Sequence, residues 1–314
     1  MIGEVKRLLI IPHIKVHNAN ALSSPFTIGF PAMTAWLGAV HALQRHLNTQ
    51  DIPVIFSATG VVSHDVNLQT YKAENDYVHS IVGTGNPLDK TGARSAFIEE
   101  ARCHLDVSLI VEFKGIGIDQ YDQMLSLVTQ LLHAKMKLAG GDIKSFQPPF
   151  CTNSSENNYD DWRKIQRYLM PGYALIERRD LMMSAMAGGS DALNALVDFL
   201  TVHHTCEQDG EGNIEWRSSR KSMGDKPAGW IVPIATGFQA VSEVAVAKNQ
   251  RDPETPHRFA ESLVTLGEFK MPHRLQNVEQ LLWRYHSDGD LYLCQQSMQL
   301  PAASSDLTSV EPEY

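Results

Sequence analysis

A buried strand, a polar connection and an amphipathic helix follow one another at the start of the chain and limit the folds available to it. The run Leu8-Leu9-Ile10-Ile11 lies inside a stretch, 5–16, that predicts a buried strand. The connection His17-Asn18-Ala19-Asn20-Ala21-Leu22-Ser23-Ser24-Pro25 carries amides and hydroxyls but no carboxylate. Such neutral groups suit phosphates or exposed bases better than they suit acid–base chemistry.

An amphipathic helix comes next in the sequence. It begins near Pro31, and proline is favoured in the first turn of helices. Apolar residues then recur at i, i+3, i+4 and i+7, the spacing of a helix with one buried face. These residues are Met33, Trp36, Leu37, Val40, Leu43 and Leu47.

The following segments predict an α+β fold. Residues 52–62 predict two strands interrupted near Gly60, residues 107–113 predict a further strand, and residues 119–138 predict a helix that ends at Gly140-Gly141. Strand, helix, strand, strand, helix is the beginning of a ferredoxin-like split βαβ pattern. We therefore expect residues 1–146 to form the first part of a ferredoxin-like (RRM-like) core.

The second half predicts an insertion and a return to the core. Residues 147–158 are polar and indicate a boundary or a loop. Residues 147–228 should form an inserted, largely helical, thumb-like region with helices at 162–169 and 191–200. Ser190 or Asp191 should cap the second of these helices. Residues 207–226 predict a mobile charged loop. Residues 229–300 predict a strand at 229–236 and short helices at 258–266 and 275–285, and residues 301–314 predict a disordered acidic tail.

The charge of the chain is negative but unevenly distributed. The formal net charge of −9 argues against an RNA-binding protein. Basic residues gather in the opening segment and in 251–286, whereas acidic residues gather in 207–215 and in the tail. A basic face for RNA with an acidic back for basic protein partners fits this distribution, and so does an ordinary acidic enzyme.

Several classes of protein and site are disfavoured. No apolar run reaches the roughly 18 residues of a membrane span, and the first residues lack the apolar core of a signal peptide, so we expect a cytoplasmic protein without membrane contact. His203 and His204 lack a second ligand pair, and no GxxxxGK sequence is present. We therefore expect neither a metal nor another cofactor.

Lys137 stands close to a glycine pair, Gly140-Gly141. Two glycines let a backbone approach a ligand closely and expose its N–H groups. The C-terminus of a helix explains the same residues equally well.

A second cationic block contains His257 and Arg258, with Arg251 and Arg274 nearby in the sequence. An Arg side chain can bind phosphate with two N–H groups or stack on a base. A surface helix with salt bridges to acidic neighbours is an equally good interpretation of this block.

These blocks, taken in order, resemble the Csy-two family of small RNA-end-binding subunits of the CRISPR type I-F surveillance complex, a Cas-five-type branch of the RAMP superfamily. The resemblance extends from about residue 8 to about residue 286. Its further blocks are His104-Leu105-Asp106-Val107-Ser108-Leu109, Met136-Lys137-Leu138-Ala139-Gly140-Gly141, Leu169-Met170-Pro171-Gly172-Tyr173-Ala174-Leu175, Gly229-Trp230-Ile231-Val232-Pro233-Ile234, Arg251-Asp252-Pro253-Glu254-Thr255-Pro256-His257-Arg258-Phe259-Ala260-Glu261, Gly267-Glu268-Phe269 and Pro272-His273-Arg274.

The resemblance implies a non-catalytic subunit with a RAMP core and a thumb-like insertion. Such a subunit pairs with the large subunit of the Csy complex, binds the 5′ handle of the crRNA and caps the filament of backbone RAMP subunits. Target DNA is an indirect partner, reached through the complex, where guide pairing reads the sequence. RAMP proteins also use a Gly-rich loop against RNA. The RNA-binding residues expected on this basis are Asn18, Asn20, Ser23, Lys137, Gly140, Gly141, Arg251, His257, Arg258 and Arg274.

Two other functions stay open. A metal-independent endoribonuclease on the same fold would use a histidine as general base at a ribose 2′-OH, and His17, His41 and His257 are available. Type I-F systems have a separate enzyme for that step, so the resemblance argues against cutting. The third hypothesis is a protein-binding cap that touches RNA little, which the net negative charge favours.

Overall fold

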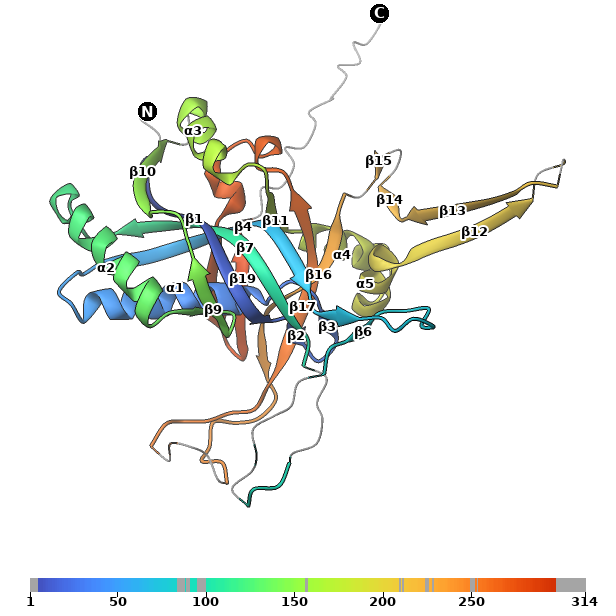
Figure 1. Cartoon of the computed structure of the whole chain (residues 1–314), viewed down its shortest axis with the longest axis horizontal. Coiled ribbons are helices and arrows are strands. Elements are labelled where there is room, and N and C mark those ends of the chain that lie inside the picture. Colours follow the sequence, from blue (N-terminus) through green and yellow to red (C-terminus); the bar gives the residue numbers. More distant parts are fainter. Residues whose placement is uncertain are drawn as a thin grey trace, which may run out of the picture.

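The computed structural model describes residues 5–83, 88, 91–94, 100–155, 158–208, 210, 212–223, 226–227, 229–248, 252 and 254–297. Within these residues the chain is α+β, with helices packed on a large antiparallel sheet (Figure 1). None of the helices in this described part is both long and apolar enough to cross a membrane.

The first half of the chain forms one side of the sheet. Strand order there is β9-β1-β7-β4, with β8 at the edge and β10 paired to the first half of β1. The elements are β1 (Val5–Asn20), β2 (Leu22–Ser24), β3 (Thr27–Ile28), α1 (Met33–Asn48), β4 (Ile55–Leu68), β5 (Thr70–Tyr71), β6 (Ser80–Ile81), β7 (Arg102–Lys114), the 3-10 turn η1 (Ile118–Gln120), α2 (Tyr121–Ala134), β8 (Lys137–Leu138), β9 (Gly141–Ser145) and β10 (Phe150–Ser155).

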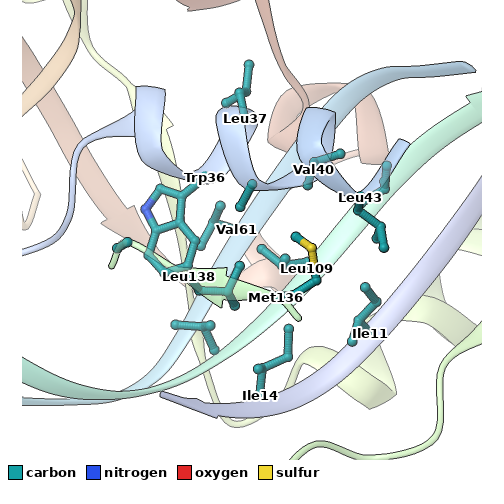
Figure 2. Close-up of a cluster of buried hydrophobic side chains, with 14 of the residues drawn as sticks. Ile11, Ile14, Trp36, Leu37, Val40, Leu43, Val61, Leu109, Met136 and Leu138 are labelled. Atoms are coloured by element: carbon teal, nitrogen blue, oxygen red, sulfur yellow. The ribbon is translucent and has the colours of Figure 1, made fainter. Parts of the chain in front are cut away.

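Helices α1 and α2 cover one face of this part of the sheet. The buried face of α1 meets side chains of β1, β4, β7 and the β8 hairpin, as Figure 2 shows for Trp36, Val40 and Leu43 above Ile11 and Leu109. Each such side chain contributes roughly 1.5–3 kcal/mol when fully buried. The predicted helix and its apolar stripe are therefore confirmed.

The second half of the chain completes the sheet. Its pairings run β11-β17-β16-β19-β18-β4, and β11 also pairs with β4, so these strands form a closed ring. The elements are α3 (Tyr159–Leu169), β11 (Tyr173–Glu177), α4 (Arg179–Ala187), α5 (Ala192–Leu200), β12 (Val202–Gln208), β13 (Ile214–Arg220), β14 (Ser222–Met223), β15 (Lys226–Pro227), β16 (Ile231–Ala240), β17 (Ala260–Lys270), the 3-10 turns η2 (Pro272–Arg274) and η3 (Val278–Leu281), β18 (Trp283–Asp288) and β19 (Leu291–Gln296).

Helix α3 packs on the other face of the sheet, but only at one end. Trp162 and Leu169 bury against Leu8 and Ile10, at the beginning of β1. The indole N–H of Trp162 donates to the carbonyl of Leu275, 2.9 Å away. The second half of β1 extends beyond this small core, so the polar side chains there stay accessible.

Several element predictions were wrong in the first half. Strand β4 is continuous through Gly60, where a Cβ would lie 2.5 Å from Leu281 Cγ, so the glycine serves packing against η3 and interrupts no strand. The helix predicted over 119–138 ends at Ala134, and Gly140-Gly141 belongs to a hairpin. The polar segment 147–158 contains β10, which pairs with β1.

Three predictions for the second half were also wrong. The predicted mobile loop at 207–226 contains most of the hairpin β12–β13. The helix predicted at 258–266 is strand β17, because β16 and β11 pair with it on its two sides. The helix predicted at 275–285 is η3 followed by β18.

Other predictions for the second half agree with the structure. Helices α3 and α5 and strand β16 lie where they were expected, and Asp191 caps α5 by accepting from the Asn194 N–H at 2.8 Å. The tail 301–314 lies outside the described residues. The division at 146/147 and 228/229 stays a prediction.

Candidate nucleic-acid interface

Along strand β1, the residues that face the core change from odd-numbered to even-numbered and then back to odd-numbered. Leu9 and Ile11 lie in the core under α1 and α2, followed by Ile14 and Val16 and then by Ala19. Each change needs one extra residue, and the pairing with β7 shifts register between Ile11 and Ile14 and between Val16 and Ala19. Two β-bulges therefore interrupt β1, and bulges of this kind re-aim the side chains beside them.

The backbone at the two bulges is left-handed. His13 has φ 49° and Asn18 has φ 60°, a region that residues other than glycine seldom occupy. Side chains of β7 hold both bulges. The N–H of His13 donates to Ser108 Oγ and the N–H of Asn18 donates to His104 Nδ1, and both donor–acceptor distances are 3.0 Å. Such conformations persist where neighbouring groups fix them.

Between and beside the bulges, polar side chains share the sheet face opposite α1 and α2. Strand pairing places Lys15 beside Asp106 and His17 beside Asp142, which in turn pairs with Lys137. We call this surface the polar face. It comprises His13, Lys15, His17, Asn18, His64, His104, Asp106, Ser108, Lys137, Asp142 and Lys144, from the neighbouring strands β4, β7, β1, β9 and β8, of which the first four lie side by side in Figure 1.

Two stacked imidazole pairs lie on the polar face. The rings of His17 and His104 are 4.2 Å apart at 18°, and the rings of His13 and His64 are 4.0 Å apart at 24°. Burial is the main cause that lowers the pKa of His64 below its usual value, and the charge of His13 lowers it further. Planar side chains of this kind can stack on the bases of single-stranded RNA.

The hairpin β8–β9 borders the polar face. Its two turn residues, Ala139 and Gly140, both have positive φ, of 48° and 76°, as a tight hairpin turn requires. A Cβ on Gly141 would lie 2.7 Å from Val16 Cγ1 and 2.8 Å from Ala19 N. Gly141 thus allows close packing on β1, whereas Gly140 faces open space.

Lys137 is the cation of this hairpin. Its ammonium lies 2.9 Å from Asp142 Oδ1, and the two side chains are 63% and 58% exposed. Hydrogen bonding to Lys137, followed by the charges of Lys137, Lys144 and His17, lowers the pKa of Asp142. An exposed ion pair of this kind contributes little to stability, so Lys137 can exchange its carboxylate for a phosphate.

The polar connection lies next to the hairpin, since the N–H of Asn20 donates to the carbonyl of Ala139 at 2.8 Å. The Asn20 side chain hydrogen-bonds to the backbone of Leu22 through both its oxygen and its nitrogen. Ser23 Oγ lies 2.8 Å from Thr27 Oγ1. The fold thus brings Asn18, Asn20, Lys137, Gly140 and Gly141 together, with Asn20 and Ser23 hydrogen-bonded within their own turns.

The cationic block at 251–274 lies elsewhere. Arg258 donates through Nε to the Ser242 carbonyl at 3.1 Å and pairs with Asp290 at 2.9 Å, and with Phe238 and Tyr292 it lines a hollow of about 170 Å³. The His257 ring packs edge-on against Phe259 at 5.1 Å.

The two other arginines of this block are Arg274 and Arg251. Arg274 is exposed in η2, beside α3, and Arg251 lies outside the described residues. Among the described residues, no hydrogen bond, ion pair or ring contact links Arg258 or Arg274 to the polar face.

Several residues of the polar face were missed as binding candidates from sequence. His13 and Lys15 were recognisable from the sequence only as basic residues, and His64, His104 and Lys144 were not recognised as RNA-binding candidates. A usable signal was present, because His13, Lys15 and His17 alternate with apolar residues in a half-buried strand pattern. The sequence could not show that His64 and His104 come from strands beside it.

Comparison with known proteins agrees with the resemblance found in the sequence. A family described as "CRISPR-associated protein (Cas_Csy2)" matches residues 9–294, which include the whole polar face. The chain is also similar to "CRISPR-associated protein Csy2" of Pseudomonas aeruginosa (strain UCBPP-PA14), with 32% identity over 315 residues, or 92% of this chain and 94% of that relative. Both matches extend over nearly all of the chain, which therefore belongs to the CRISPR-associated Cas_Csy2 family.

Proposed function

We propose that the chain is a subunit of the type I-F CRISPR Csy complex that binds the 5′ handle of the crRNA through the polar face. Family membership supports the complex, and the observation that carries the RNA site is the polar face with its stacked histidine pairs. Lysine contacts to phosphate supply affinity, and base stacking with edge hydrogen bonds supplies preference for a fixed handle sequence.

A ferredoxin-like RAMP core is part of this proposal. The order β9-β1-β7-β4, with α1 after β1 and α2 after β7, supports it, since this is the βαββαβ arrangement of ferredoxin-like folds. In such folds the helices cover one face of the sheet. The opposite face is then available to RNA, as in RRM domains.

The proposed role is structural rather than catalytic. His17 lies on the polar face, His41 stacks on Tyr285 beside α1, and His257 packs on Phe259, so these three histidines occupy separate regions. An RNA-cleaving site would need a base and a cation at one scissile bond. Their separation excludes a site that combines two of these three histidines as general base and general acid, which supports a subunit that holds RNA without cutting it.

Protein partners complete the proposal: the large subunit, an adjacent backbone RAMP subunit and, through the complex, target DNA. The hairpin β12–β13 supports this, because it stands off the body in Figure 1 and all residues of its two strands except Val202 are exposed. A two-stranded hairpin is marginally stable alone in water. A partner surface would give such a hairpin a place to pack.

The test is binding of handle RNA to the chain co-purified with a tagged large subunit, measured over a series of salt concentrations. Replacing Lys15 and Lys144 by Ala should weaken binding and reduce the salt slope by about one to two, because each phosphate contact contributes about one to it. Arg45→Ala, on α1 at the opposite side of the sheet, is the control. An unchanged slope in the double variant would rule out the polar face, and cleaved RNA would rule out the non-catalytic role.

A further inference from the structure

A compact cluster of His13, His64, Asp106 and Ser108 joins three neighbouring strands on the polar face. His13 Nδ1 lies 3.1 Å from Asp106 Oδ1, and His64 Nε2 lies 2.7 Å from Ser108 Oγ. Ligand atoms of His13, His64 and Asp106, one from each, all lie within 4.8 Å of one another. The cluster is partly buried, with 28% of the His13 side chain and 20% of the Asp106 side chain exposed.

The His64 ring is oriented from outside the cluster. Its Nδ1 lies 2.6 Å from the carbonyl oxygen of Pro171, and a carbonyl can only accept, so Nδ1 carries a proton. In the neutral ring, the Nε2 lone pair therefore points into the cluster, where the Ser108 hydroxyl donates to it. Metal-ligating histidines characteristically donate their other N–H to a carbonyl or a carboxylate in this way.

His13 reaches the cluster through an unusual backbone. Its φ of 49° lies in the left-handed region, and its N–H donates to the same Ser108 hydroxyl. The bulge directs the imidazole towards Asp106 and against the face of His64. An uncommon conformation held by neighbouring groups points to a functional constraint.

We infer that His13, His64 and Asp106 form a binding site for one divalent transition-metal ion of the zinc type. Two imidazole nitrogens and a carboxylate oxygen are ligands that Zn²⁺ and similar ions prefer. Ligand atoms of a tetrahedral zinc site lie about 3.3 Å apart when its bonds are about 2.0–2.1 Å long, and His13 and Asp106 are already at this spacing. In the structure His64 Nε2 faces Ser108 Oγ at 2.7 Å and the rings of His13 and His64 are stacked. Binding therefore requires the Ser108 side chain to move aside and the His64 ring to turn its Nε2 towards His13 and Asp106, and three protein ligands then leave one position open.

The inference is independent of the proposed RNA contact, because it concerns only the cluster. A bound ion would tie β1, β4 and β7 together, and through His64 it would also tie them to the segment after α3. It would also add positive charge to the polar face.

The first experiment uses the full chain after treatment with a chelator, with Zn²⁺ in equilibrium dialysis and Co²⁺ in visible absorption spectroscopy. We expect one ion per chain and the intense visible bands of four-coordinate Co²⁺. His64→Gln and Asp106→Asn should each lower the affinity at least about 10- to 100-fold. His17→Gln, which removes a stacked histidine from the same strand and face, should leave the affinity unchanged.

A second measurement needs no variant and so does not depend on the folding of one. In the wild-type chain, Zn²⁺ should protect His13 and His64 from diethyl pyrocarbonate, whereas the exposed His286 in β18 should react equally with and without it. Zn²⁺ uptake that does not saturate at one ion per chain, equal affinity in His17→Gln and His64→Gln, or unprotected His13 and His64 would each overturn the inference.

Discussion

Asn18 and Asn20 stand two residues apart in β1, but their side chains have different surroundings. Both polar atoms of the Asn20 side chain bind the backbone of Leu22, so this side chain stabilises its own turn. Asn18 takes the left-handed conformation, and its exposed side chain hydrogen-bonds to none of the described residues. Of the two, Asn18 is the better placed to contact a base.

The role of the Asn18 side chain can be separated from that of its backbone. Asn18→Gly keeps the left-handed φ without strain, so we expect the free energy of unfolding to change by less than about 0.5 kcal/mol, while discrimination among handle sequences is lost. Asn18→Val should lower the free energy of unfolding by about 1–2 kcal/mol, because a β-branched side chain tolerates the left-handed conformation far less well than Asn does. Urea unfolding and competition binding with handle variants measure both effects, and retained discrimination in Asn18→Gly would exclude the side chain.

At the scale of elements, the hairpin β8–β9 illustrates how two adjacent glycines serve different purposes. Gly140 supplies a positive φ in open space, whereas Gly141 lets β9 lie against the backbone of β1. The first requirement is conformational and the second is steric. They predict different consequences for the same substitution.

Gly141→Ala should lower the free energy of unfolding by about 3 kcal/mol, since the new Cβ meets backbone atoms of Ala19 that cannot move aside. Gly140→Ala is the matched control and should lower it by about 1 kcal/mol, through backbone strain alone. Urea unfolding of both variants checks this, and equal effects would show that the contact with β1 is looser than the structure indicates.

Glu177 links β11 to β19. Its side chain is 4% exposed, and its Oε2 accepts from the N–H of Gln296 at 2.9 Å. Burial raises the pKa of Glu177 from 4.5 to about 7. Between these values the unfolded chain releases the proton while the folded chain retains it, so the stability contributed by this group falls as pH rises, by about 3 kcal/mol in total.

Glu177→Gln removes this titration because the amide is neutral throughout. The free energy of unfolding of Glu177→Gln relative to wild type should rise by about 3 kcal/mol between about pH 4.5 and pH 7.5. Urea unfolding at several pH values tests this, with Glu215→Gln on the exposed strand β13 as control. A difference that stays constant with pH would contradict the raised pKa.

At the scale of the whole molecule, two parts of the chain differ in how they are stabilised. The paired strands β1, β4 and β7 lie between helices on both faces near α3. The hairpin β12–β13 has cross-strand pairs along its length, but almost all of its residues are exposed. Its stability should therefore depend on what it contacts in the assembled complex.

Hydrogen exchange measures this difference. In the isolated chain, the amides of β12 and β13 should exchange far faster than those of β1 and β7, because few buried contacts oppose local opening. In the assembled complex we expect the hairpin to slow by at least about tenfold, while β1 and β7 change little. Equally fast exchange of the hairpin in both states would mean that no partner covers it.

Local pattern predicted some elements well and others poorly. Helix α1 was predictable because its apolar stripe is a local signal, although the helix begins at Met33 after the N-cap Ala32, so that Pro31 precedes it and does not lie in its first turn. Strand β17 was not, because its apolar residues also fit a helical spacing, and pairing with β16 and β11 decides between the two. The blocks that resemble the family were readable from the sequence, and the family match confirms their identity.

The sequence by itself determined the α+β class, the amphipathic α1, the buried beginning of β1 and the family, because periodicity and ordered motifs are properties of neighbouring residues. The tertiary structure alone decided which of these residues share a surface. His13, His64 and Asp106 come from three strands and meet only because β7 lies between β1 and β4, with bulges that turn two histidines onto one face. Strand order and register are long-range properties, since they depend on which segments pair across the whole chain.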